Sequence, residues 1–166
     1  ERSGRELDLQ VTLGAALLAL KGPAAPLMGE AYGRALELCR ETGTEDLKAA
    51  ALFGVWQDRL NRAELTEALE LADELLRTSK RRGDWKVEVA GHRCALCTKL
   101  FSADFASALD HFEQLMVLHV PGRRDSAELL LDPWVSGRSL VSWVLLLLGH
   151  PERALAHSRE ALNGAH

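Results

Sequence analysis

Four stretches of this 166-residue chain have apolar residues at the spacing of one helical face, and each has an alanine at the same place in its pattern. A small side chain at this place lets two helix backbones approach closely. The alanines are separated by 37, 40 and 46 residues, a period typical of helical-hairpin repeats. The spacing therefore predicts about four hairpins, each of which buries one face on the next. The four alanines are Ala31, Ala68, Ala108 and Ala154.

Glycine, proline and short polar segments divide the chain into eight stretches of helical length. The composition also favours helices, because 32 leucines and 23 alanines make up a third of the chain and isoleucine, a strong strand former, is absent. We predict an all-α fold, a right-handed α-α superhelix of about four hairpins that forms a single domain over residues 1–166. The predicted helices cover residues 5–20, 27–41, 46–61, 64–81, 85–101, 104–118, 134–148 and 151–163.

Several short segments lie in an order and at a spacing that resemble a known kind of repeat. They are Gly22-Pro23-Ala24-Ala25-Pro26, Arg62-Ala63-Glu64-Leu65, His111-Phe112-Glu113 and Leu147-Leu148-Gly149-His150-Pro151. Together with the alanine pattern, they resemble the tetratricopeptide-like (TPR-like) helical region of large bacterial regulators. In that family an adenylate/guanylate cyclase or DNA-binding module and an NTPase domain precede the repeats. The resemblance implies a protein-interaction region within a larger signalling or transcription-regulating protein.

Charge and hydropathy exclude two classes of partner. The net charge of −4 disfavours nucleic acid, since domains that bind it usually carry a basic excess. The longest apolar run, Leu140–Leu148 with one serine, is shorter than the roughly 20 residues that span a bilayer, so no membrane segment is expected. The chain begins Glu-Arg-Ser-Gly-Arg without a methionine, and we expect it to be a piece of a longer protein. Three cysteines favour a reducing, cytoplasmic setting over a disulfide scaffold.

Cys94 and Cys97 have the C-x-x-C spacing of a metal site, with His92 two residues before them. A tetrahedral site needs four ligands, and no second pair of this kind occurs in the sequence. The other interpretation is a core stripe, because free cysteine packs as a small apolar residue. We expect this core role and predict no metal or other cofactor. Residues at spacings of 3, 4, 3 and 4 form the stripe: Val87, Ala90, Cys94, Cys97 and Phe101.

The sequence contains no nucleophile motif, zinc-protease motif or phosphate-binding glycine loop, and its carboxylates follow polar helix faces with basic residues nearby. We therefore expect no enzymatic activity, and a catalytic domain with an unrecognised site is the least favoured alternative. Stacked hairpins bind partners through a concave surface, which the first helix of each hairpin lines. Arginine and tryptophan dominate binding hot spots. The residues predicted to bind a peptide or protein are Trp56, Arg59, His92, Arg93, Lys99 and Arg138.

Two functions fit these features. One is a non-catalytic regulatory scaffold that docks another protein or another domain of the same chain, and the other is a sensor that holds a small ligand in the same groove. The last helix keeps Leu155 and Leu162 beside polar residues, which suggests a possible homodimer. Trp143 is expected to pack and Trp134 to be exposed. The long irregular segment of residues 119–133 is expected to be either a functional loop or an insertion that lengthens one repeat.

Overall fold

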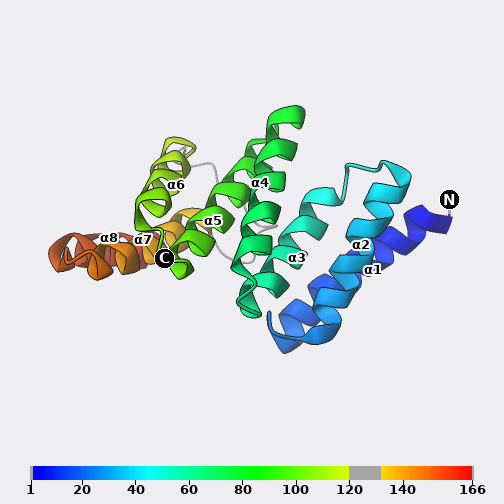
Figure 1. The fold of residues 1–166 in the computed structure, drawn as a ribbon, viewed down its shortest axis with the longest axis horizontal. Coiled ribbons are helices and arrows are strands. Elements are labelled where there is room, and N and C mark those ends of the chain that lie inside the picture. The colour runs from blue at the N-terminus through cyan, green and yellow to red at the C-terminus, as the bar shows by residue number, and fades with distance from the viewer. Residues whose placement is uncertain (1, 120–131, 166) are drawn as a thin grey trace. The chain divides into compact units, whose positions relative to one another are not determined.

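The computed structural model describes residues 2–119 and 132–165, and all of its regular structure is helical (Figure 1). The predicted all-α class is confirmed, and every predicted helix end agrees with the structure to within three residues. Most of the irregular segment at residues 119–133 lies outside the described residues. The eight helices of the described chain are Arg2–Lys21 (α1), Pro26–Thr42 (α2), Lys48–Asn61 (α3), Leu65–Arg82 (α4), Trp85–Phe101 (α5), Phe105–Val117 (α6), Pro133–Leu147 (α7) and Pro151–Gly164 (α8).

The chain forms two compact units, Glu1–Thr78 and Ser79–His166. In unit 1, α2 packs against α1, and α3 contacts both of them. In unit 2, α6 packs against α5, α7 contacts both of them, and α8 packs against α7. Within each unit, then, an odd-numbered helix lies against the two helices of the hairpin before it. This sequential packing is consistent with helical-hairpin repeats.

The alanines that define the sequence repeat are all buried. Their exposed fractions are 4% for Ala31, 0% for Ala68 and Ala108, and 6% for Ala154. Each lies on the second helix of a hairpin, at the place where the periodicity predicts a helix contact. The structure confirms that this face is buried on α2 and largely buried on α4 and α6, whereas on α8 the prediction is wrong for Leu155 and Leu162, which are 50% and 66% exposed.

The turn that joins the two helices of a hairpin recurs three times with the same backbone hydrogen bonds. Three successive N–H groups donate to carbonyls four, three and five residues earlier, as from residues 62, 63 and 64 of the α3–α4 turn. The α5–α6 and α7–α8 turns repeat this arrangement 40 and 86 residues further along the chain, the same offsets that separate the buried alanines. The middle residue is left-handed in each, with φ of 58° at Ala63, 58° at Ala103 and 82° at Gly149.

The largest core cluster of unit 2 joins α5, α6, α7 and α8. Cys94 and Cys97 lie on the buried side of α5, with 0% and 8% of their surfaces exposed, so their predicted core role is confirmed. Phe101 was expected to continue this stripe, and that expectation is wrong: it is the last residue of α5 and is 58% exposed. The cluster consists of Leu96, Leu100, Ala108, Phe112, Val141, Val144, Leu145 and Ala154.

The two tryptophans of α7 have the reverse of their predicted environments. Trp134 is buried in a second small cluster with Val89 and Leu115, whereas Trp143 is 63% exposed. The Asp132 carboxylate begins the helix by accepting hydrogen bonds from the backbone N–H groups of Trp134 and Val135, and packing with Val89 and Leu115 buries the Trp134 ring.

None of the described helices combines the length and the apolar character that crossing a bilayer requires.

Candidate interaction surface

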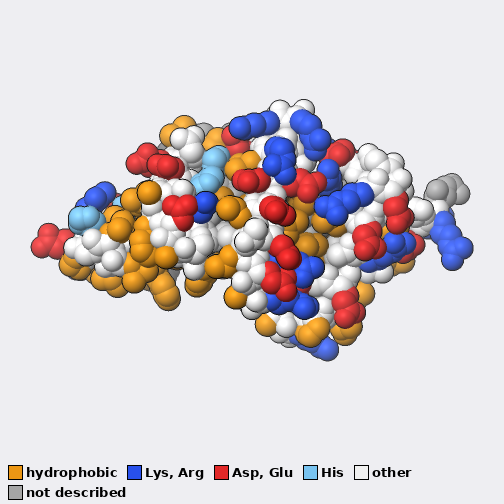
Figure 2. Space-filling view, in the orientation of Figure 1, with side chains coloured by type: hydrophobic (Ala, Val, Ile, Leu, Met, Phe, Trp, Pro, Cys, Tyr) orange, Lys and Arg blue, Asp and Glu red, His pale blue; other side chains and the backbone are white. Residues whose placement is uncertain are grey.

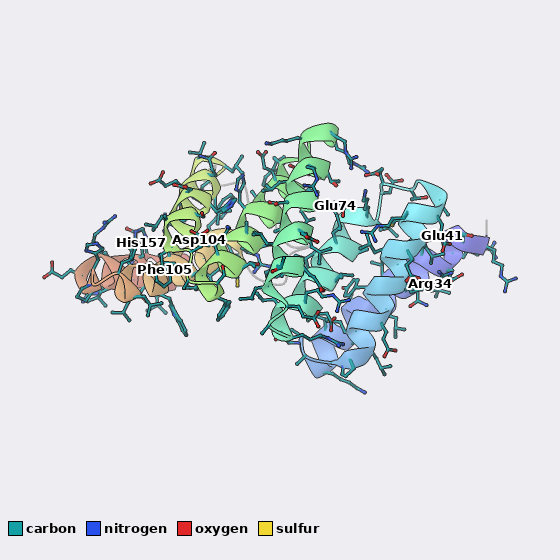
Figure 3. The ribbon with its side chains drawn as sticks, viewed as in Figure 1. Arg34, Glu41, Glu74, Asp104, Phe105 and His157 are labelled. Atoms are coloured by element: carbon teal, nitrogen blue, oxygen red, sulfur yellow. The ribbon has the colours of Figure 1, made fainter. Side chains whose placement is uncertain are left out.

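Two of the predicted partner-binding cations form ion pairs within the repeated turn. Arg59 Nη1 lies 2.7 Å from Glu64 Oε2, and Lys99 Nζ lies 2.8 Å from Asp104 Oδ2, 40 residues further on. In Figure 3, Asp104 lies at the start of α6, where its carboxylate also accepts a hydrogen bond from the Ser107 N–H. Lys99 and then Ser107 lower the pKa of Asp104 to about 2. Both cations therefore stabilise the turns between helices.

Arg138 joins three helices of unit 2. Its Nε donates to Glu160 Oε2 of α8 at 2.9 Å, and its Nη1 lies 3.1 Å from the Met116 sulfur of α6. The hydrogen bond from Arg138 is the largest cause that lowers the pKa of Glu160. The Arg138 guanidinium thus already contacts side chains of two neighbouring helices.

His92 and Arg93 lie on α5, both partly buried. The Nδ1 atom of His92 is 3.0 Å from the Nδ1 atom of His111 on α6. Burial first, and then the neighbouring His111 and Lys80, lower the pKa of His92 to about 4. This contact between two imidazoles joins α5 to α6.

Trp56 is 2% exposed and lies beside Phe53, with 5.5 Å between ring centroids. A side chain this deeply buried belongs to the core of unit 1 and offers almost no surface to a partner. Trp56 and Arg59 belong to unit 1, and the other four predicted residues belong to unit 2. That any of these six residues contacts a partner stays a prediction.

A different set of residues forms the main exposed apolar surface of unit 2. Trp143, Leu146 and Leu147 stand at i, i+3 and i+4 on α7, and Leu155 and Leu162 stand two turns apart on α8. Their exposed fractions lie between 50% and 66%. We call these five residues the α7–α8 face; Figure 2 shows apolar side chains gathered over these two helices.

The fold leaves this face exposed because the opposite sides of both helices make the core. Val141, Val144 and Leu145 of α7 pack toward α5 and α6, and Ala154 of α8 joins the same cluster. At the roughly 100 Å² that a half-exposed leucine or tryptophan presents, the α7–α8 face amounts to about 500 Å², as large as the largest apolar patch on most monomers. Patches of this size usually mark a site of interaction.

The sequence contained a signal for this face that the prediction passed over. Residues 143–148 are six consecutive apolar residues, whereas a helix that buries one side needs only three or four in every seven. The additional apolar residues had to lie on a second side of the helix. Only Leu155 and Leu162 were identified in advance, as residues that favour self-association.

The two thiols of unit 2 lie in an environment that keeps them protonated and unreactive. Cys94 and Cys97 are free, and burial raises their pKa values to about 12 and about 11. A metal ligand must be a thiolate, which this environment disfavours. Within the described residues, no three His, Cys, Asp or Glu side chains are grouped so that they could hold a metal ion.

Comparison of the chain with protein-family models, with curated proteins and with solved structures found no match.

Proposed function

We propose that this chain is a non-catalytic protein-interaction module and that the α7–α8 face is its docking surface. The observation that carries the proposal is the exposure of Trp143 together with four leucines on the two helices of one hairpin. Apolar burial is the main favourable term in association. Tryptophan is also one of the residue types that dominate binding hot spots.

The apolar character of this surface suits a helical ligand. Amphipathic helices bind apolar surfaces between helices through residues at i, i+3, i+4 and i+7. The proposed partner is therefore a protein segment that becomes or remains helical, either in another protein or in another domain of the same chain.

On the basis of the sequence resemblance, we propose that this module belongs to a cytoplasmic, TPR-like regulator whose other domains include an NTPase. The thrice-repeated turn and the buried alanines support a hairpin-repeat architecture. The three free, buried cysteines support a reducing compartment. In such a regulator the module would act as a scaffold that couples a partner to the NTPase.

Fluorescence polarisation with labelled amphipathic helical peptides tests the docking surface. Peptides with leucine at i, i+4, i+7 and i+11 are expected to bind with a Kd on the order of micromolar, and their scrambled versions are expected not to bind. Leu155→Glu should weaken binding at least tenfold, because it places a charge in the apolar contact. Val117→Glu is the matched control: Val117 is 77% exposed on α6, outside the α7–α8 face.

Two results would favour a different function. Stabilisation of the chain by a small metabolite, unaffected by Leu155→Glu, would favour the ligand sensor. Turnover of a substrate, lost when one polar side chain is replaced, would show that the chain is an enzyme.

A further inference from the structure

A second exposed apolar surface runs along α1 in unit 1. Leu9, Leu13 and Leu20 stand at i, i+4 and i+11 and are 70%, 48% and 83% exposed. The exposed Ala16 occupies i+7 between them, so the stripe is continuous along three turns. The other side of α1 is buried through Leu7, Gly14 and Leu18. We call Leu9, Leu13, Ala16 and Leu20 the α1 stripe.

The two surfaces match the packing that the chain uses within each unit. There, an odd-numbered helix lies against both helices of the hairpin before it, as α3 lies on α1 and α2 and as α7 lies on α5 and α6. The α7–α8 face is an apolar surface shared by the two helices of a hairpin. The α1 stripe is an apolar surface on a single odd-numbered helix.

We propose that the α1 stripe of one copy packs on the α7–α8 face of a second copy, so that the chain associates head to tail. This inference rests on the proposed function and names the partner of its docking surface as a second copy of the chain. The occupant is the amphipathic helix that such a surface selects, presented already folded, which lowers the entropic cost of binding.

The size of the contact sets its strength. About 500 Å² on the α7–α8 face and about 400 Å² on α1 come close to the roughly 1,000 Å² in total that a small specific interface needs. Association is therefore expected in the micromolar range. Because each copy carries one surface of each kind, the contact is heterologous and does not close on itself after two copies. The average size of the assembly should thus increase with concentration beyond the dimer.

Sedimentation velocity of the full chain between about 1 and about 500 µM tests this inference, since the range brackets a micromolar Kd. The unaltered chain is expected to show a weight-average sedimentation coefficient that rises with concentration. Leu13→Glu and Leu155→Glu should each remove the rise, because each destroys one half of the contact. Val117→Glu should sediment like the unaltered chain.

Mixing the two variants separates head-to-tail pairing from the alternatives. The Leu13→Glu chain keeps its α7–α8 face and the Leu155→Glu chain keeps its α1 stripe, so an equimolar mixture should form a dimer and nothing larger. Circular dichroism must show unchanged helix content, and Leu20→Glu and Leu162→Glu form a second pair should either variant fail to fold.

Three results would overturn the inference. A monomer at every concentration excludes the second copy; if the helical peptides still bind, the proposed function stands. Association lost in Leu155→Glu but kept in Leu13→Glu indicates a symmetric contact between two α7–α8 faces. A mixture of the two variants that stays monomeric shows that the surfaces do not meet each other.

Discussion

The Nδ1 atoms of His92 on α5 and His111 on α6 lie 3.0 Å apart, with their rings tilted by 51°. At this distance one nitrogen must donate and the other must accept, which requires the accepting imidazole to be unprotonated at that nitrogen. Protonation of the accepting nitrogen would replace the hydrogen bond by two facing N–H groups. The contact between α5 and α6 is therefore sensitive to acid.

Unit 2 is expected to lose stability as the pH falls below about 6.5, the ordinary pKa of histidine. The pKa of His92 is about 4 in the fold, so between these values the unfolded chain binds a proton that the folded chain does not. The loss begins near the unfolded pKa and ends near the folded one. It should amount to on the order of 1–2 kcal/mol, because water reaches part of the pair and screens it. Urea unfolding followed as a function of pH measures this loss.

The substitution His92→Gln supplies the control for that measurement. Burial also lowers the pKa of His157, so part of the acid sensitivity comes from elsewhere and remains in the variant. The difference in unfolding free energy between about pH 7.5 and about pH 4.5 should be smaller in His92→Gln than in the unaltered chain. An unchanged difference would mean that the histidine pair does not contribute.

Gly54→Ala is expected to destabilise unit 1 by about 1–3 kcal/mol or more. The ring of Tyr32 lies against Gly54 of α3 and Gly14 of α1, and a Cβ on Gly14 would come within 2.7 Å of the ring. A Cβ on Gly54 would collide with the same ring, whose side chain is only 6% exposed and cannot move aside freely. Denaturant unfolding of the variant measures the cost.

Gly33→Ala is the matched control in the same unit. Gly33 lies inside α2, and no atom lies within 4 Å of the position where its Cβ would be. Alanine is the better helix former, so this substitution should raise the unfolding free energy by up to about 1 kcal/mol. Equal effects of the two substitutions would show that the tyrosine is not confined by the glycines.

The helices and the buried alanines were predictable because both depend on local sequence. Periodicity fixes which residues share a helix face, and the recurrence of Ala31, Ala68, Ala108 and Ala154 indicated which face meets a neighbour. The exposed face was not predictable in the same way. Around Trp143 the sequence is apolar on every side, so periodicity does not distinguish the buried side from the exposed one. Trp134 was misjudged because its burial depends on Leu115, which is distant in sequence.

The ion pairs of two predicted site residues were missed for a related reason. Arg59 and Lys99 were chosen for their charge, but the residues that neutralise them, Glu64 and Asp104, lie five positions on, across the turn. A helical pattern pairs residues three or four apart, so this contact becomes visible only when the turn is known. The 40-residue offset between the two ion pairs equals that between Ala68 and Ala108, and a search for repeated charge pairs would have found it.

The thiols of the native chain should react slowly with a disulfide reagent at about pH 8. Because burial raises the pKa of Cys94 from 9.0 to about 12, the thiolate fraction at that pH falls by a factor of about a thousand. All three thiols should react quickly in denaturant, and a thiol titration followed by absorbance compares the two states. Added Zn²⁺ should leave the melting temperature unchanged. A zinc-dependent rise in melting temperature, absent from Cys94→Ala, would restore the metal site as an interpretation.

Ala103→Gly is expected to stabilise unit 2, by up to about 1 kcal/mol. Ala103 holds a φ of 58° in the middle of the α5–α6 turn, where an L side chain is strained and glycine is not. The α7–α8 turn, with the same hydrogen bonds, already has Gly149 at this place. Ala106→Gly is expected to destabilise unit 2. Ala106 is exposed within α6, where replacing alanine by glycine lowers the unfolding free energy by up to about 1 kcal/mol. The urea concentrations at which the two variants are half unfolded, compared with that of the unaltered chain, measure both effects. If both substitutions lower the midpoint, the left-handed residue does not strain the turn, and the shared geometry of the three turns has no consequence for stability.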